Sequence, residues 1–485
     1  MQPRRHGGRI GRNGSVLSAL PRHSGMGGAA AADDRLRGPD PGQDRRSGRA
    51  RDHGPLGDGL DGVMNDIAHG GTLPGHNVEG GFDVARIRED FPILKRQVHG
   101  KPLVYFDSGA SAQKPRAVIN AMTEVLEDQY TNIHRGAHYL SQTLTDRYEG
   151  VRGTIARFIN APSEEQIVIT RNTTEAINLL AASYGRKFLN KGDGVLISAM
   201  EHHANIVPWQ MLRDEKEIEL KVAPIDDRGV LDMDAFEAML DEGTKLVAIT
   251  HCSNVLGTHT PAKEIIRLAH ARGIPVMLDG SQSVVHSAID VQDLDADFFV
   301  FTGHKLYGPN AIGVLYGKAE LLAQMPPYQG GGDMIASVTY EKTTYQEPPH
   351  RFEAGTPPIV EAIGLGAAID YVTAIGMDRI AAHEQALLAY ATERLTAMAD
   401  IRLFGTAPEK AAIFSFIQDG IHPFDTAATL DRAGVAVRVG QHCAEPLMAR
   451  LGVDGTVRAS LAMYNTTAEI DVMITALERA RTLFG

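Results

Sequence analysis

The sequence predicts an α/β fold with a mainly parallel sheet sandwiched between helices, followed by a smaller α+β region. From about Phe82 to Thr356, short apolar runs alternate with amphipathic helical patterns. The apolar runs are rich in Val, Ile, Leu and Phe and lack polar alternation, which is typical of strands buried on both faces. Alternation of such strands with helices indicates a parallel sheet covered on both sides.

The expected elements follow in order along the chain. Helices are expected over residues 174–184 and 262–271, the latter ending at Gly273 as a C′ glycine. After Thr356 the pattern changes to helices over 360–375, 377–398 and 468–483, with strands over 412–417 and 435–439. The strands expected in the main sheet are 166–170, 195–198, 246–250, 275–278, 298–301 and 312–316.

These changes divide the chain into four expected regions. Residues 1–63 contain Arg and Asp but no Lys, Glu or aromatic residue, and they show no periodicity. We therefore expect 1–81 to be a disordered extension or the result of a start site placed too far upstream, with Met64 as an alternative start. A segment over 82–105 packing with the small domain, a large cofactor-binding domain over 106–356 and a small domain over 357–485 complete the prediction.

Composition excludes several classes of protein. The net charge of −12 disfavours a nucleic-acid partner, and no apolar run is long enough to cross a membrane. Cys252 and Cys443 are the only cysteines, which disfavours a disulfide framework and a cysteine-rich metal site. A soluble cytoplasmic protein is expected.

Polar residues follow the predicted strands, where parallel sheets bind their ligands. Asp279 follows the strand 275–278. Its carboxylate could hold a protonated pyridine nitrogen, as enzymes that use pyridoxal 5′-phosphate (PLP) require. Alternatively, it could simply cap the next helix. Lys305 follows the strand 298–301 after a glycine and fits a Schiff-base lysine, although a lone lysine is more often a surface charge. The acid and the lysine 26 positions later occur in the order found in fold-type I PLP enzymes.

Two more segments support this interpretation. Thr173 and Thr174 open a helix directly after a strand, which suits a phosphate group or a plain helix cap. His202 and His203 follow another strand, where an imidazole could stack on a flat ring. A metal site is disfavoured because adjacent side chains point apart and no carboxylate or cysteine partner is evident.

Longer motifs make the resemblance specific. The segments RNTTEAIN, EHHANIVPWQ, THCSNVLGT, DGSQ, FTGHKLYGP, RFEAGTP, RVGQHCAEPLM and RASLAMYN resemble the class V aminotransferase superfamily. More closely, they resemble the group II cysteine desulfurases of the SUF iron–sulfur assembly system. The resemblance covers the chain from about Phe82 to its C-terminus.

The resemblance implies a fold-type I PLP enzyme that converts L-cysteine to L-alanine and passes sulfur to a small SUF acceptor protein for iron–sulfur cluster assembly. Thr356 resembles a threonine that reaches the phosphate of a neighbouring subunit, so a homodimer is implied. Asn254, Arg438 and Arg458 resemble residues around the substrate, and a guanidinium matches a carboxylate well. The implied cofactor contacts are Lys305 as the covalent attachment, Asp279 at the ring nitrogen, Gln282 at the ring hydroxyl oxygen, His202 stacked on the ring, and Thr173, Thr174, Thr302 and His304 at the phosphate.

Cys443 resembles the nucleophile that receives sulfur as a persulfide. It lies in a polar, glycine-containing loop where His442 or Arg438 could favour the reactive thiolate. Cys252, directly after an apolar strand, fits a buried small hydrophobic residue. Gln441 replaces a histidine found in many relatives and cannot titrate near neutral pH, which bears on proton delivery or partner docking.

Two other functions are compatible with the same motifs. A selenocysteine lyase uses the same fold and residues, so the sequence separates it poorly from a desulfurase. A catalytically inactive scaffold for sulfur assembly is disfavoured because Lys305, Asp279, Cys443 and Arg458 are all present.

Overall fold

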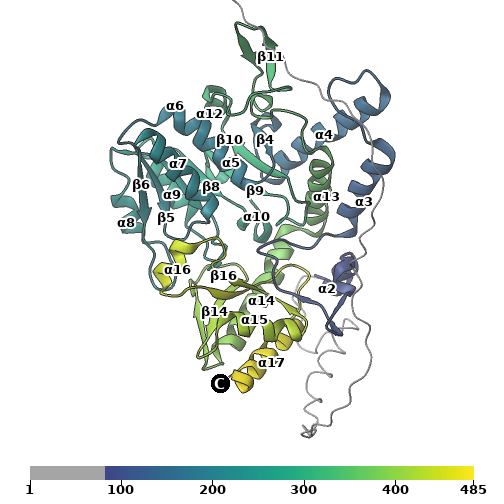
Figure 1. Ribbon diagram of the computed structural model, residues 1–485, viewed down its shortest axis with the longest axis vertical. Coiled ribbons are helices and arrows are strands. Elements are labelled where there is room, and N and C mark those ends of the chain that lie inside the picture. Colours follow the sequence, from purple (N-terminus) through teal and green to yellow (C-terminus); the bar gives the residue numbers. More distant parts are fainter. Residues whose placement is uncertain (1–81, 485) are drawn as a thin grey trace, which may run out of the picture. The chain divides into compact units, whose positions relative to one another are not determined.

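The computed structural model describes residues 82–484, and the predicted extension over 1–81 lies outside them. Within this part of the chain the largest sheet has seven strands in the order β4-β10-β9-β8-β7-β5-β6 (Figure 1). Only β10 runs antiparallel to its neighbours, which confirms the predicted mainly parallel sheet. The strands are β4 (Ile167–Thr170), β5 (Gly194–Ser198), β6 (Glu219–Ala223), β7 (Thr244–Thr250), β8 (Val276–Asp279), β9 (Phe298–Thr302) and β10 (Gly313–Gly317).

Alternate residues of these strands enter two hydrophobic cores, one on each face of the sheet. In β4, Ile167 and Ile169 belong to the core that includes helices α4, α9 and α13, whereas Val168 belongs to the core that includes α5 and α7. Because both faces are covered, the strands need apolar residues at successive positions. The helices are α4 (Tyr139–Phe158), α5 (Thr173–Leu180), α7 (Val207–Lys216), α9 (Ala262–His270) and α13 (Ile359–Ile375).

Strand β6 was not predicted from the sequence. It lies at one edge of the sheet, and most of its side chains are exposed or half-buried. Lys221 in this strand forms an ion pair with Asp241 at 2.6 Å. An edge strand can carry such polar residues, so it lacks the apolar run that marks the central strands.

Strand β4 at the opposite edge is anchored by a buried ion pair. Glu353 Oε1 accepts a hydrogen bond from the Ile169 backbone N–H at 2.7 Å, and Arg152 donates to the Ile167 carbonyl oxygen at 2.8 Å. Arg152 and Glu353 also form two hydrogen bonds with each other, at 2.8 and 3.1 Å. Glu353 belongs to the RFEAGTP motif, so at least part of this motif has a structural role in holding strand β4.

The C-terminal part contains a four-stranded antiparallel sheet in the order β13-β14-β17-β16. A third hydrophobic core lies between this sheet and its helices. Strands β13 and β17 were not predicted. The elements are β13 (Ile401–Phe404), β14 (Ile413–Gln418), β16 (Arg438–Gly440), β17 (Thr456–Ser460), α14 (Met377–Thr396), α15 (Pro423–Arg432) and α17 (Thr467–Phe484).

The strand predicted over residues 435–439 is two strands in different sheets. β15 (Val435–Ala436) pairs in parallel with β3 (Val104–Tyr105), while β16 pairs with β17. The strand partner therefore changes at Val437: before it, β15 pairs with β3 of the N-terminal segment, and after it, β16 pairs with β17. This pairing brings Asp107 next to β17, where it forms a parallel bridge with Ser460.

Among the described residues, no single helix is long and apolar enough to cross a membrane. Helices α13 and α14 reach that length and apolar content only as a pair, and the pair is bent by 75°.

Replacing Arg152 with methionine should strongly destabilise the protein. The side chain is 3% exposed, and its loss would leave the Glu353 carboxylate buried without a counter-charge. We expect Arg152→Met to lower the free energy of unfolding by about 3–5 kcal/mol, measured by urea unfolding. Arg157→Met, at an exposed position of the same helix, should change it by less than about 0.5 kcal/mol. Equal midpoints for the two variants would contradict the anchoring role of the ion pair.

Candidate active site

A cavity of about 330 Å³ opens beyond the carboxyl ends of β4, β5, β7, β8 and β9. This is the position at which open parallel sheets bind ligands. The loops after these strands form most of its wall, which is completed by Arg438, Val439, His442, Cys443 and Arg458 from the C-terminal part of the chain. All predicted site residues except Thr356 line the cavity: Thr173, Thr174, His202, Asn254, Asp279, Gln282, Thr302, His304, Lys305, Arg438, Cys443 and Arg458.

Lys305 and Asp279 come from neighbouring strands. Asp279 ends β8, and Lys305 follows β9. Burial lowers the pKa of Lys305 to about 8, and the nearby Asp279 carboxylate opposes this effect. The amine is therefore neutral, and so nucleophilic, in a larger fraction of molecules than an exposed lysine would be.

The turn that carries Lys305 depends on close packing at Gly303. A Cβ atom at this position would lie 2.5 Å from the Ile312 side chain, which no ordinary contact allows. The Gly303 N–H donates to the Ile312 carbonyl oxygen at 2.9 Å, and its own carbonyl accepts from Gly308 at 3.0 Å. Glycine is thus required where β9 leads into the lysine.

The start of α5 suits an anionic group. The Asn172 side chain caps this helix by accepting from the Glu175 N–H at 2.8 Å, and the first backbone bond within the helix comes from Ala176. The N–H groups of Thr173 and Thr174 precede that bond, and both residues line the cavity. Backbone donors at a helix start are a common way to hold phosphate.

His202 is a neutral imidazole held in a defined orientation. Its Nδ1 accepts a hydrogen bond from the Ala204 N–H at 3.0 Å, so its proton resides on Nε2. Burial, reinforced by the positive charge of Lys305, lowers the pKa of His202 to about 4. His202 therefore presents a flat, uncharged ring with one N–H donor at neutral pH.

Glu201 supports this segment and was missed in the sequence. Its buried carboxylate accepts hydrogen bonds from Ser198 Oγ at 2.5 Å, Asn205 Nδ2 at 2.7 Å and the Thr250 N–H at 2.9 Å. Asn205 in turn accepts from Trp209 Nε1 at 2.9 Å. Burial raises the pKa of Glu201 to about 7. Glu201, Asn205 and Trp209 follow one another at intervals of four residues in EHHANIVPWQ, and this spacing could have indicated the network in the sequence.

Cys443 is exposed, and its loop is fixed by hydrogen bonds from the large sheet. The His203 N–H donates to the Cys443 carbonyl oxygen at 2.7 Å, and His203 Nε2 accepts from the Glu445 N–H at 3.0 Å. Asn254 Nδ2 donates to the His442 carbonyl oxygen at 2.8 Å. Both His442 and Cys443 have left-handed backbone angles, with φ of 54° and 55°. These contacts hold a strained turn against the cavity.

His442 carries no positive charge beside Cys443 at neutral pH. Its ring is buried, its Nε2 lies 2.9 Å from Thr456 Oγ1, and burial lowers the pKa of His442 to about 3. Arg438, also considered from the sequence, is charged and interacts electrostatically with Cys443. Of these two neighbours, only Arg438 carries a positive charge at neutral pH.

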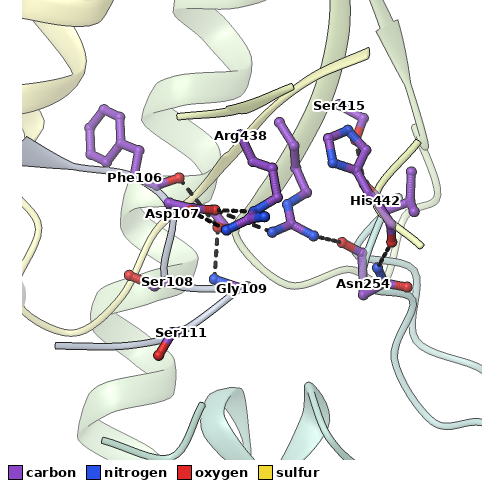
Figure 2. A network of polar contacts seen from close by, with 12 residues as sticks. Phe106, Asp107, Ser108, Gly109, Ser111, Asn254, Ser415, Arg438 and His442 are labelled. Carbon is purple, nitrogen blue, oxygen red and sulfur yellow. Dashed lines mark hydrogen bonds and ion pairs between the residues drawn. The ribbon is translucent and has the colours of Figure 1, made fainter. Parts of the chain in front are cut away.

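Asp107 joins two arginines behind the cavity and was also missed in the sequence. Its carboxylate accepts two hydrogen bonds from Arg438, at 2.9 and 3.0 Å, and a longer one from Arg458 at 3.4 Å. Arg458 also donates to the Asn254 carbonyl oxygen at 2.9 Å. Figure 2 shows Asp107 beside Arg438, and Asn254 reaching toward His442. Burial lowers the pKa of Arg458 to about 10, which leaves it charged at neutral pH.

The predictions for Cys252 and Thr356 are considered separately. Cys252 is buried against Ala411 and Ile413, as expected of a small hydrophobic residue, but it also lines the cavity. Burial raises the pKa of its thiol to about 12. Thr356 is exposed and does not line the cavity of its own chain; its predicted contact with a second subunit stays a prediction.

The donor set fits PLP. The cavity offers a buried amine with a lowered pKa, a carboxylate at the end of the adjacent strand, a neutral aromatic ring and a helix start suited to phosphate. PLP carries an aldehyde, a basic ring nitrogen and a phosphate, which match these groups.

The two cysteines should differ sharply in reactivity. In the native protein Cys443 should react with a disulfide reagent such as DTNB at least tenfold faster than Cys252, because only an accessible thiolate reacts readily. Titration should therefore count one fast thiol in the native protein and two after unfolding. Cys443→Ser should remove the fast thiol, whereas Cys252→Ser should retain it. Two fast thiols in the native protein would contradict the burial of Cys252.

The sequence is similar to those of several curated proteins named as cysteine desulfurases. The chain is 52% identical over 405 residues to a cysteine desulfurase of Dickeya dadantii, covering 83% of this chain and 98% of that protein. It is 51% identical to a cysteine desulfurase of Synechococcus elongatus and 53% identical to a probable cysteine desulfurase of Mycolicibacterium paratuberculosis. It spans only 66% and 58% of the length of these two relatives.

Solved structures of cysteine desulfurases have a similar fold. A cysteine desulfurase of Escherichia coli superposes with a TM-score of 0.78 at 38% identity, covering 84% of this chain and all of that chain. A cysteine desulfurase of Thermococcus onnurineus gives the same TM-score at 37% identity and the same coverage. The class V aminotransferase family matches residues 104–473. The chain therefore belongs to the class V aminotransferase family, whose members are PLP-dependent enzymes of fold type I.

Proposed function

We propose that this protein is a cysteine desulfurase that converts L-cysteine to L-alanine and keeps the sulfur as a persulfide on Cys443. The observation that carries the proposal is the exposed Cys443 thiol on the wall of the cavity that also contains Lys305 and Asp279. An aminotransferase of the same fold does not require a cysteine at this position. The desulfurase names of several relatives support the same activity.

PLP, when bound, supplies an electron-poor ring that accepts charge from the substrate. Lys305 would hold its aldehyde carbon and Asp279 its ring nitrogen. His202 would cover one face of the ring and donate from Nε2. Gln282 would contact the ring hydroxyl oxygen, and the phosphate would lie at Thr173, Thr174, Thr302 and His304.

Arg458 would bind the substrate carboxylate. Its Nε atom is buried and has no hydrogen-bond partner among the described residues, although its guanidinium is charged at neutral pH. An unsatisfied buried donor of this kind is costly unless a ligand completes it. Asn254, which supports both Arg458 and the loop of Cys443, would lie beside the same carboxylate.

Cys443 would carry the sulfur-transfer step. Its thiolate attacks the substrate sulfur, so that an S–S bond forms as the substrate C–S bond breaks. The carbon product gains protons and leaves as alanine. Arg438 and Arg458 are charged groups that interact electrostatically with Cys443.

The biological setting follows from the closer resemblance. We infer a group II enzyme of the SUF system, acting in the cytoplasm as a homodimer in which Thr356 approaches the phosphate of the neighbouring subunit. The persulfide would pass to a small acceptor protein for iron–sulfur cluster assembly. Gln441, exposed two residues before Cys443, is a surface position where that acceptor would approach.

Removing the lysine should abolish the enzyme. Lys305→Ala should lose the absorbance band of covalently bound PLP and all detectable alanine production from L-cysteine, since no other described amine lines the cavity. Lys263→Ala, at an exposed ion pair, is the control and should keep both signals. Turnover of L-cysteine by Lys305→Ala would refute the assignment.

Removing the thiol should separate cofactor binding from sulfur transfer. Cys443→Ser should bind PLP normally yet release no alanine from L-cysteine, because a serine hydroxyl ionises far too weakly to replace the thiolate. Cys252→Ser should retain near wild-type turnover with a modest loss of stability. Assays with L-selenocysteine extend the test, since a selenocysteine lyase would keep activity on that substrate without Cys443. Normal L-cysteine turnover by Cys443→Ser would exclude the persulfide mechanism.

A further inference from the structure

The peptide carbonyl that precedes Lys305 is bound by three donors from a distant part of the chain. The carbonyl oxygen of His304 accepts a hydrogen bond from the Lys114 amine at 2.9 Å and another from the Ala112 N–H at 3.1 Å. Ser111 Oγ makes a longer contact with the same oxygen, at 3.4 Å. Among the described residues, the backbone groups of His304 and Lys305 form no other hydrogen bond. The start of the lysine turn is therefore held by a segment that lies about 190 positions earlier in the sequence.

Lys114 is a half-buried cation that contacts carbonyl oxygens instead of a carboxylate. Its amine also donates to the Ala112 carbonyl oxygen at 2.6 Å, and within residues 82–484 it forms no ion pair. Burial lowers the pKa of Lys114 to about 8, so most molecules carry the charge at neutral pH. A hydrogen bond from a charged donor is stronger than one from a neutral donor. The bond from Lys114 is therefore the strongest of the three that hold the His304 carbonyl.

Lys114 does not line the cavity, although residues close to it in the sequence do. Gly109 and Ala110 are part of the cavity wall, and the Gly109 carbonyl oxygen accepts a hydrogen bond from Gln282 Nε2 at 2.8 Å. The amine of Lys114 is directed instead to the backbone of the lysine turn. Lys114 therefore acts on a ligand in the cavity only through the residues that it holds.

We propose that Lys114 is a positioning residue for Lys305: its charged amine fixes the His304 carbonyl and thereby sets the place from which the Lys305 side chain reaches the aldehyde of PLP. Gly303 fixes the backbone just before the turn, through its bond to Ile312, and Lys114 fixes the peptide within the turn. Reacting groups must be closely aligned, and a displacement of about 1 Å can slow a reaction about a hundredfold. The inference rests on the role of Lys305 in the proposed function.

The test measures how fast PLP becomes covalently attached. The full chain is freed of PLP, PLP is added back, and the absorbance band of covalently bound PLP is followed over time. Lys114→Met keeps an unbranched side chain but removes the charged donor, so attachment should slow by about tenfold or more. The total amount of PLP bound at saturation should not change, because the groups proposed to hold its ring and phosphate remain in place.

Lys410→Met is the matched control. Lys410 is also half-buried, its pKa is also lowered by burial to about 8, and its amine donates to a backbone carbonyl oxygen, that of Gly405, at 2.5 Å. It does not line the cavity, so Lys410→Met should lower the melting temperature as Lys114→Met does but attach PLP at the wild-type rate. Lys114→Arg keeps a charged donor and should attach PLP faster than Lys114→Met.

Equal attachment rates for Lys114→Met and Lys410→Met would overturn the proposal, as would a rate for Lys114→Arg no higher than that of Lys114→Met. If Lys114→Met does not fold, Lys114→Gln, which keeps a shorter polar side chain, takes its place in the same comparison. A covalent PLP band in Lys305→Ala would instead overturn the role proposed for that lysine. Loss of the band in Lys305→Ala together with wild-type attachment in Lys114→Met would count against the positioning role alone. The assay uses no L-cysteine, so its result does not depend on sulfur transfer.

Discussion

The loop of Cys443 is held on the cavity by backbone and side-chain hydrogen bonds from the large sheet. His203 binds it at Cys443 and Glu445, and Asn254 binds it at His442. The segments involved are separated by nearly 190 to about 240 positions in the chain. Without these contacts the large sheet would keep Lys305 and Asp279, but the thiol would have no fixed place beside them. The chemistry proposed for the site depends on this docking of the Cys443 loop on the loops of the large sheet.

Much of this organisation could be predicted from the sequence. Strands buried on both faces leave continuous apolar runs, and the polar residues that end them, such as Asp279, mark the ligand site. The roles of Asp107 and His203 could not be predicted in this way. Asp107 contacts Arg438 across 331 positions, and such a contact leaves no local pattern. The strand predicted over 435–439 was found as two strands for the same reason, because its two halves pair with segments that are distant from each other in the sequence.

Burial gives the cavity a simple charge distribution. It lowers the pKa values of His202 and His304 to about 4, so these imidazoles are neutral at neutral pH. Positive charge then comes from Arg438, Arg458 and the predominantly protonated Lys305, whose pKa is about 8, and negative charge comes from Asp107 and Asp279. The Asp279 carboxylate opposes the loss of charge from Lys305, and Asp107 pairs with Arg438, so opposite charges lie close together in both places. Such pairing limits the cost of placing ions in a poorly solvated space.

The backbone of the loop has an energetic consequence of its own. Left-handed angles at two successive non-glycine residues, His442 and Cys443, cost roughly 1–2 kcal/mol each, so the docked turn stores conformational energy. The hydrogen bonds from His203 and Asn254 must offset that cost. If these hydrogen bonds break, the two residues can relax to ordinary backbone angles, which recovers part of the conformational energy. The free-energy difference between a docked and an undocked turn is therefore smaller than the hydrogen bonds alone would make it.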